Sequence, residues 1–223
     1  MIFQDRKDAG RQLALRLTDY ANRSDLLVLG LPRGGVPVAY EVARELHAPL
    51  DVFLVRKLGV PGQEELAMGA IASGGVRVIN EDVVSHLHIP DSVIDVVAKQ
   101  ELRELERREL AYRGDRPSPD VKDRTAILID DGLATGSTMR AAALALRKQD
   151  PAQIVVAVPV AAAHTCDEFR SVVDEIICAV TPDRFYGVGL WYEDFSQTSD
   201  EEVRELLRRV PQTRQHAARG SGG

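Results

Sequence analysis

The stretch AILIDDGLATGSTMRAAALAL, residues 126–146, joins an apolar run, two acids, a loop of small residues and an alanine-rich segment. The run AILI has the continuous hydrophobicity of a strand that is covered on both faces of a parallel sheet. Asp130 and Asp131 follow it directly, and we expect a helix to begin near Ser137. In open α/β sheets, ligands bind beyond the carboxyl ends of the strands, so this order indicates a ligand site.

Four further apolar runs repeat the strand pattern, at residues 25–30, 51–57, 153–160 and 175–180. Segments long enough for helices lie between the runs, at residues 35–46, 136–149 and 164–172, and a helix is also expected at 5–22. Strands that alternate with helices predict a mainly parallel sheet with right-handed crossovers.

Residues 80–115 interrupt this alternation. Most of the segment reads as one long helix that begins near Asp91 or Ser92, either of which can cap it. The first half of the helix is apolar and the second half is charged, with Glu104 and Arg108 four residues apart. We expect a helical insert rather than a second full domain.

The expected organisation is therefore one domain over residues 1–211 that contains the insert. The polar, glycine-rich residues 212–223 are expected to form a disordered tail.

Bulk composition excludes several classes of protein. The chain has 223 residues, 44% of them hydrophobic, and a net charge of −6 with a pI near 5.4. This acidic balance argues against a nucleic-acid partner. No apolar run reaches the ~18 residues of a membrane span, and the first residues lack the pattern of a signal peptide. We therefore expect a cytoplasmic protein, with Cys166 and Cys178 as buried thiols in a reducing compartment.

The residue types after the AILI strand favour a sugar phosphate as ligand. A helix N-terminus attracts phosphate, and Thr135, Ser137 and Thr138 add hydroxyl donors. Ionised carboxylates only accept hydrogen bonds, so Asp130 and Asp131 suit a sugar diol. An ordinary helix cap would explain one Asp or one Thr, but it leaves most of the run unexplained.

This stretch resembles the ribose-phosphate loop of the type I phosphoribosyltransferases. The resemblance implies an open parallel sheet with helices on both faces and a small helical hood. It also implies that the two acids contact the ribose hydroxyls of phosphoribosyl pyrophosphate (PRPP), while the loop cradles its 5′-phosphate. The PRPP-binding residues implied in this way are Asp130, Asp131, Gly132, Ala134, Thr135, Gly136, Ser137 and Thr138.

A second candidate is the turn within LGLPRGGVPVA, residues 29–39, which follows the first strand. Its Gly34–Gly35 pair allows backbone N–H groups to face an anion, and Arg33 adds positive charge. A plain surface turn is the alternative. The turn resembles the pyrophosphate loop of the family, which commonly contains an unusual peptide bond.

A third candidate is the segment that starts with Arg56 and Lys57, at the end of the 51–57 strand. It resembles the flexible catalytic loop of adenine and orotate phosphoribosyltransferases, which closes over PRPP. The two cations would neutralise the leaving pyrophosphate, and Glu65 is the candidate proton carrier. The alternative is a hairpin with exposed charges.

The sequence identifies the acceptor-binding residues less specifically than the PRPP-binding residues. Residues 182–203 loosely resemble the segment that stacks the purine in hypoxanthine-guanine phosphoribosyltransferases, with Phe185 or Tyr186 as the stacking residue. Trp191, Tyr192 and Phe195 are expected to pack in the core. The run AVPVAAAH, residues 157–164, lacks the lysine that reads a 6-oxo group in that family.

Taken together, the resemblance implies transfer of a 5-phosphoribosyl group from PRPP to a nitrogen acceptor, with release of pyrophosphate. It implies Mg²⁺ as cofactor, with Asp130 and Asp131 on the metal side of the site. The expected partners are PRPP and a small-molecule acceptor, and a homodimer is left open. The alternative is a regulator that binds PRPP with little or no catalysis. Such proteins often carry a DNA-binding module or a basic face, whereas this chain is acidic and shows no helix-turn-helix pattern outside the expected sheet.

Overall fold

The computed structural model describes residues 2–114 and 116–210, so the expected disordered tail at 212–223 lies outside the described residues. The helices and strands are, in chain order, α1 Arg6–Ala14, the 3₁₀ turn η1 Thr18–Tyr20, β1 Leu26–Gly30, α2 Gly35–Leu46, β2 Leu50–Val52, β3 Val55–Val60, β4 Gln63–Ala72, β5 Val76–Ile79, α3 Glu81–His86, α4 Asp91–Arg113, β6 Thr125–Ile129, α5 Ser137–Arg147, β7 Gln153–Val160, α6 Ala163–Phe169, β8 Glu175–Val180, the 3₁₀ turn η2 Val188–Trp191 and α7 Asp200–Arg209.

The main sheet has five parallel strands in the order β2-β1-β6-β7-β8. β1 and β6 lie side by side at its centre, with Leu26 opposite Thr125 and Gly30 opposite Ile129. Every residue of these two strands is buried. Because both strands end at the same edge, the loops that follow them meet there.

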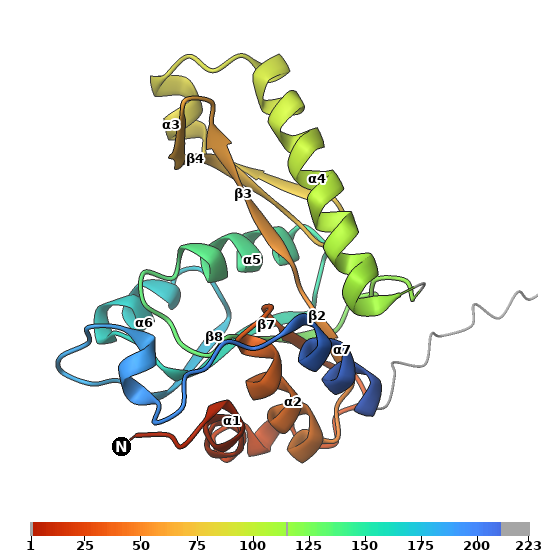
Figure 1. Ribbon diagram of the computed structural model, residues 1–223, viewed down its shortest axis with the longest axis vertical. Helices are drawn as coiled ribbons and strands as arrows, with labels where there is room; N and C mark the ends of the chain where they lie inside the picture. Colours follow the sequence, from red (N-terminus) through yellow and green to blue (C-terminus); the bar gives the residue numbers. More distant parts are fainter. Residues whose placement is uncertain (1, 115, 211–223) are drawn as a thin grey trace, which may run out of the picture.

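Helices cover both faces of the main sheet (Figure 1). Alternate side chains of a strand point to opposite faces, so Leu26 and Val28 pack with residues of α1, α2 and α7, while Leu27 and Leu29 pack with residues of α5 and α6. This arrangement confirms the expected α/β fold with helices on both faces.

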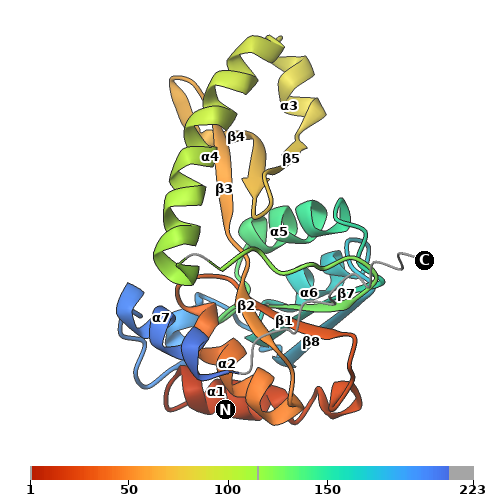
Figure 2. The same cartoon turned by 90° about the vertical axis from the view of Figure 1, so that its right-hand side faces the viewer.

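A second, antiparallel sheet, β3-β4-β5, joins α3 and α4 in a separate layer. We call these elements, residues 55–113, the hood. Figures 1 and 2 show the hood rising from the main body on the side away from α1, with α4 running along β3. The lower end of α4 reaches α7 through a hydrogen bond from the Tyr112 hydroxyl to Asp200 (2.9 Å).

The prediction of one strand at 51–57 is wrong. The run is divided between two sheets, because Val52 ends the parallel pairing with β1 and Val55 begins antiparallel pairing with β4. The expected loop after Arg56 is instead the β3–β4 hairpin, which was the stated alternative, a hairpin with exposed charges. Hydrophobicity predicts an extended chain but not which neighbour it pairs with.

Two helix predictions also need correction. The helix expected at 5–22 ends at Ala14 and is followed by a 3₁₀ turn. The long helix is present as α4, but Pro90 occupies its N-cap position and makes no side-chain cap, so neither Asp91 nor Ser92 has that role. A proline just before a helix suits its fixed φ, and the helix begins without a side-chain acceptor.

The expectation of two free thiols is wrong as well. Cys166 in α6 and Cys178 in β8 form a disulfide, with their Cα atoms 7.0 Å apart. The chain between them folds back so that α6 lies against β8, and the sequence spacing alone did not reveal this contact. Among the residues described, no helix is long and apolar enough to cross a membrane.

Candidate functional site

The turn after β1 and the two acids after β6 lie against each other at the carboxyl edge of the main sheet. A side chain at Gly35 would collide with the Ile129 carbonyl oxygen (2.6 Å) and the Asp130 Cα (2.8 Å), and one at Gly34 would overlap the Asp131 carboxylate. Only glycine permits this close approach. The Pro32–Arg33 peptide is cis, in agreement with the unusual bond expected in this turn.

Contacts from distant segments hold Asp131 in place. Arg6 of α1 forms an ion pair with its carboxylate (2.8 Å), and the exposed fractions of the two side chains are only 12% and 16%. The hydroxyl of Tyr192 donates to the Asp131 carbonyl oxygen (2.5 Å). Asp130 accepts a hydrogen bond from the Asp131 backbone N–H (2.9 Å). Arg6 was not among the predicted site residues, because no local sequence signal links it to residue 131.

The two acids carry more negative charge than their surroundings balance. Burial, followed by the neighbouring Asp131 carboxylate, raises the pKa of Asp130 well above its ordinary value. Burial also raises the pKa of Asp131, and the Arg6 guanidinium opposes that rise. Hydroxyl donors or a cation bound here would stabilise the ionised forms. The pair is therefore suited to a diol, a hard metal ion, or both.

The loop from Gly132 to Thr138 leads into α5, which begins at Ser137 as expected. Gly136 has φ +71°, and a side chain there would also collide with the ring of Phe169 in α6 (2.6 Å). The hydroxyl of Thr165, also in α6, donates to the Ala134 carbonyl oxygen (2.8 Å). Of the three hydroxyl residues in this loop, Thr135 and Ser137 bond to each other through their side chains (3.2 Å) at the surface. Hydroxyls and the first N–H groups of α5 are thus available to an anion.

The cationic candidates occupy different positions. Both Nε and Nη2 of Arg56 contact Glu101 of α4 at 2.7 Å. Lys57 points to the other side of the strand and pairs with Glu65 across the hairpin (3.2 Å). Arg33 lies 3.9 Å from Asp200, which is the longest of these contacts. The fold thus brings Arg56 toward the edge of the main sheet, while Lys57 and Glu65 lie on the exposed side of the hood.

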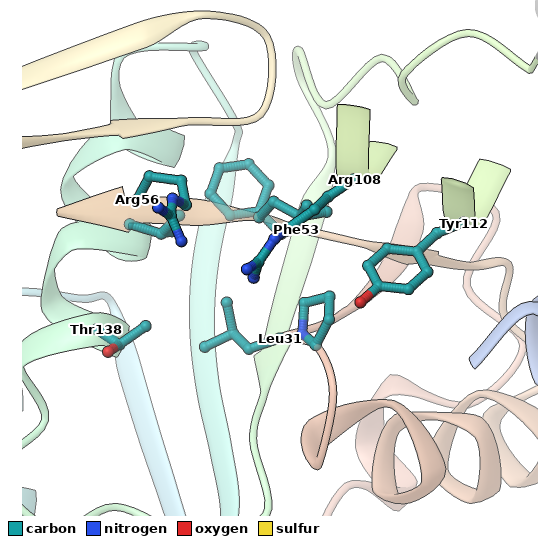
Figure 3. Close-up of a pocket in the computed structure, with 9 residues that line it drawn as sticks. Leu31, Phe53, Arg56, Arg108, Tyr112 and Thr138 are labelled. Carbon is teal, nitrogen blue, oxygen red and sulfur yellow. The ribbon is translucent and has the colours of Figure 1, made fainter. Parts of the chain in front are cut away.

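A pocket lies between the edge of the main sheet and the hood (Figure 3). Its lining residues are Leu31, Pro32, Phe53, Leu54, Val55, Arg56, Arg108, Tyr112 and Thr138. Arg108 and Tyr112 come from α4 and were not among the predicted site residues. The available sequence signal was their separation by four residues, which places them on one face of the charged half of that helix.

The acceptor candidates lie in the segment after β8, which reaches the acids through Tyr192 and places Val188 against Gly132. Tyr186 has an exposed fraction of 80%, whereas Phe185 packs against a small apolar cluster that includes Phe3 and Tyr192. Burial of Tyr192 agrees with its expected core role, and Phe195 is more exposed than expected, with the Arg6 guanidinium 4.0 Å from its ring centre. Of the two stacking candidates, Tyr186 is the accessible one.

A parallel sheet with a hood over its carboxyl edge, paired acids and a loop at a helix N-terminus define an α/β protein with a candidate site at that edge of the sheet. The family model described as the phosphoribosyl transferase domain matches residues 2–190, and the chain belongs to this family.

Relatives of the chain agree with this assignment. Proteins from two strains of Mycobacterium tuberculosis, CDC 1551 and H37Rv, whose names describe them as proposed phosphoribosyl transferases, are 48% identical over 209 residues. The alignment covers 94% of this chain and 47% of those proteins, so the chain spans about half their length. The crystal structure of TT1426 from Thermus thermophilus superposes with a TM-score of 0.84 at 39% identity, covering 94% of this chain and 99% of that one.

Within the described residues, no group of three or more His, Cys, Asp or Glu side chains could hold a metal ion. The two carboxylates at 130 and 131 nevertheless fit Mg²⁺, which prefers oxygen ligands and is often bound through one or two carboxylates together with substrate phosphates. Such an ion would depend on oxygen atoms of the ligand for much of its coordination.

Proposed function

We propose that the chain is a PRPP-dependent phosphoribosyltransferase that transfers the 5-phosphoribosyl group to a nitrogen atom of a small acceptor. One observation carries this proposal. Asp130 and Asp131 lie between the loop at the start of α5 and the Pro32–Gly35 turn, and all three meet at the carboxyl edge of the sheet. A ligand with a diol flanked by two anionic groups matches this order.

In this proposal each part of PRPP has its own partner. Asp130 and Asp131 accept hydrogen bonds from the ribose hydroxyls. Residues 132–138 bind the 5′-phosphate through N–H groups and hydroxyls. The Arg33–Gly35 turn binds the pyrophosphate, and Arg56 supplies positive charge from β3. Lys57 would also contact the pyrophosphate if the β3–β4 hairpin moves over bound PRPP.

Mg²⁺ would be held by the pyrophosphate and ribose oxygens beside Asp130 and Asp131, where it would offset the negative charge of the leaving group. The protein residues must then orient PRPP and exclude water. In the reaction, the acceptor nitrogen bonds to ribose C1 while the bond from C1 to the pyrophosphate oxygen breaks. Water exclusion matters because a cationic sugar centre would otherwise be hydrolysed. Glu65 is the proposed proton carrier, again after movement of the hairpin.

The acceptor is proposed to enter beside the segment after β8, where Tyr186 is exposed. The run AVPVAAAH is mostly apolar, and a site without a buried donor cannot strongly favour a ring through its carbonyl group. We therefore propose that hypoxanthine and guanine are not the acceptors. Rapid, saturable pyrophosphate release with either base would contradict this part of the proposal.

Thermal unfolding with PRPP and Mg²⁺ tests the proposal directly. Ligand at about 100 times its dissociation constant adds roughly 2.7 kcal/mol to the free energy of unfolding, so the melting temperature should rise. The double variant Asp130→Asn, Asp131→Asn should fold but show no such rise, because amides place donors where acceptors are needed. Absence of a shift for the wild-type chain at millimolar PRPP would refute the function.

A panel of bases, assayed for pyrophosphate release, separates the enzyme from a regulator. Saturable release with one base identifies the acceptor. PRPP binding without release for any base would favour the PRPP-sensing alternative.

A further inference from the structure

The pocket between the main sheet and the hood has a single sign of charge. Its floor is apolar and includes Leu31 and Phe53, and its charged lining residues are Arg56 and Arg108, with no carboxylate among the residues that line it. Figure 3 shows both guanidinium groups directed into the space above Leu31. A pocket with an apolar floor and two cations favours an anionic occupant, because low-polarity walls strengthen the attraction.

Within the described residues, Arg108 has more unused hydrogen-bond donors than Arg56. Arg56 directs Nε and Nη2 to one carboxylate oxygen of Glu101. Arg108 uses only its Nε, which donates to Glu104 (2.8 Å), and within the described part of the chain its two terminal nitrogens have no hydrogen-bond partner. Its side chain is 44% exposed. The planar end of this guanidinium can therefore take two oxygens of a phosphate group.

Neighbouring groups place Arg108 next to the turn after β1. Tyr112, one helical turn further along α4, lines the same pocket and donates to Asp200, the carboxylate nearest to Arg33. Burial and Asp200 raise the pKa of Tyr112 to about 12, and the charges of Arg108 and Arg33 oppose that rise. Arg33 of the main body and Arg108 of the hood therefore both lie close enough to Tyr112 to affect its pKa.

We propose that Arg108 is a further binding residue for the diphosphate group of PRPP and for the pyrophosphate that leaves. This proposal rests on the phosphoribosyltransferase function proposed above. In this proposal α4 contributes a cation to the site. Arg108 contacts the diphosphate from the hood, and the Arg33–Gly35 turn contacts the same diphosphate from the main body.

The sheet order favours the diphosphate over the 5′-phosphate as the partner of Arg108. The pocket lies over the ends of β1 and β2, where Leu31 and Phe53 follow the strands, and β1 separates β2 from β6. The ribose is assigned to β6 and the 5′-phosphate to the loop that follows it. Of that loop, only Thr138 reaches the pocket. The group on the β1 side of the ribose is therefore the diphosphate.

Titration calorimetry with three probes tests this assignment: PRPP with Mg²⁺, pyrophosphate with Mg²⁺, and ribose 5-phosphate, which lacks the diphosphate. Arg107→Gln is a matched control, because Arg107 contacts the same Glu104 carboxylate through Nε and Nη2 but does not line the pocket. We expect Arg108→Gln to weaken the binding of PRPP and pyrophosphate by at least about ten-fold, because the charged hydrogen bonds of the guanidinium to two phosphate oxygens are lost. The affinity for ribose 5-phosphate should be unchanged. Arg108→Lys should keep part of the affinity, since it retains the charge without the planar fork.

The outcomes separate the two proposals. Equal affinities of Arg108→Gln and Arg107→Gln for PRPP would overturn the role of Arg108 and leave the proposed function standing. Equal weakening of ribose 5-phosphate and PRPP would assign Arg108 to the 5′-phosphate and would also overturn the proposal. If the wild-type chain bound neither PRPP nor pyrophosphate, both proposals would fail together. Matching melting temperatures of the ligand-free variants exclude misfolding as the cause of any loss.

Discussion

At the scale of single residues, the site depends on an ion pair that joins two distant parts of the chain. Arg6 contacts Asp131, donates to the Ser196 carbonyl oxygen (2.6 Å) and lies over the ring of Phe195. The Asp131 side chain is mostly buried, and its remaining surroundings supply little positive charge. Removing one partner of such a pair leaves the other desolvated without compensation.

We therefore expect Arg6→Gln to lower the free energy of unfolding by about 2–4 kcal/mol, measured by urea denaturation. Arg23→Gln is the control, because it breaks the exposed Arg23–Asp25 pair and should cost at most about 1 kcal/mol. Adding Asp131→Asn to Arg6→Gln should recover part of the loss. Equal costs for the two arginine variants would show that Arg6 does not stabilise Asp131.

For Asp130 we expect the opposite effect, because its replacement should raise the free energy of unfolding. Its pKa in the folded chain is raised above the ordinary 3.8 by burial and by Asp131, so the native state loses stability as the pH rises from about 3.8 through the raised value. Asp130→Asn removes this cost, and the amide oxygen can still accept the Asp131 N–H. At pH 7 the ligand-free variant should be more stable than the wild-type chain, and the gain should vanish below about pH 3.8. A gain that is constant across pH would contradict the assigned cause.

At the scale of elements, α6 supports the loop that leads into α5. Thr165 bonds to Ala134, Phe169 lies where a side chain at Gly136 would be, and Cys166 ties the helix to β8. Within the described residues, the loop has no strand pairing beyond the isolated bridge from Leu133 to Ala161. The position of α6 therefore controls the geometry of the proposed phosphate site.

Reduction of the Cys166–Cys178 disulfide should lower the free energy of unfolding by about 2–4 kcal/mol, as expected for a closed loop of this length. Urea denaturation with and without dithiothreitol measures the change. The double variant Cys166→Ser, Cys178→Ser should respond to urea equally in both conditions. A wild-type midpoint that is insensitive to the reductant would show that the disulfide contributes nothing to stability.

At the scale of the whole molecule, the hood and the main body face each other across the site (Figure 2). Arg33 belongs to the main body, whereas Arg56 and Arg108 belong to the hood. A diphosphate between them would join the two layers by charged hydrogen bonds. The tip of the hairpin, residues 61–66, is exposed.

We expect PRPP with Mg²⁺ to slow amide hydrogen exchange in β3, β4 and the second half of α4. Ribose 5-phosphate should slow exchange near α5 but not in the hood, because it lacks the bridging diphosphate. Exchange followed by mass spectrometry measures both patterns. If the two ligands slowed exchange in the hood equally, the diphosphate would not be what couples the hood to the main body.

The sequence by itself determined the parts of this protein that are contiguous along the chain. The strand, acids, loop and helix of residues 126–146 form one local unit, so their order was sufficient to predict the fold class and the start of α5. The ligand that this unit binds stays a prediction. The glycine pair of the Pro32–Gly35 turn also predicted a tight turn from the sequence alone. Its backbone packs closely against residues 129–131, which only glycine permits.

Only the tertiary structure decided which distant residues meet. Arg6 is 125 positions from Asp131, and Arg108 reaches the site because α4 packs along β3. The division of 51–57 between two sheets and the pairing of Cys166 with Cys178 have the same origin. The pattern of residues along a segment indicates its burial and its local geometry. Which segments contact each other depends on the packing of all the elements, and therefore on residues throughout the chain.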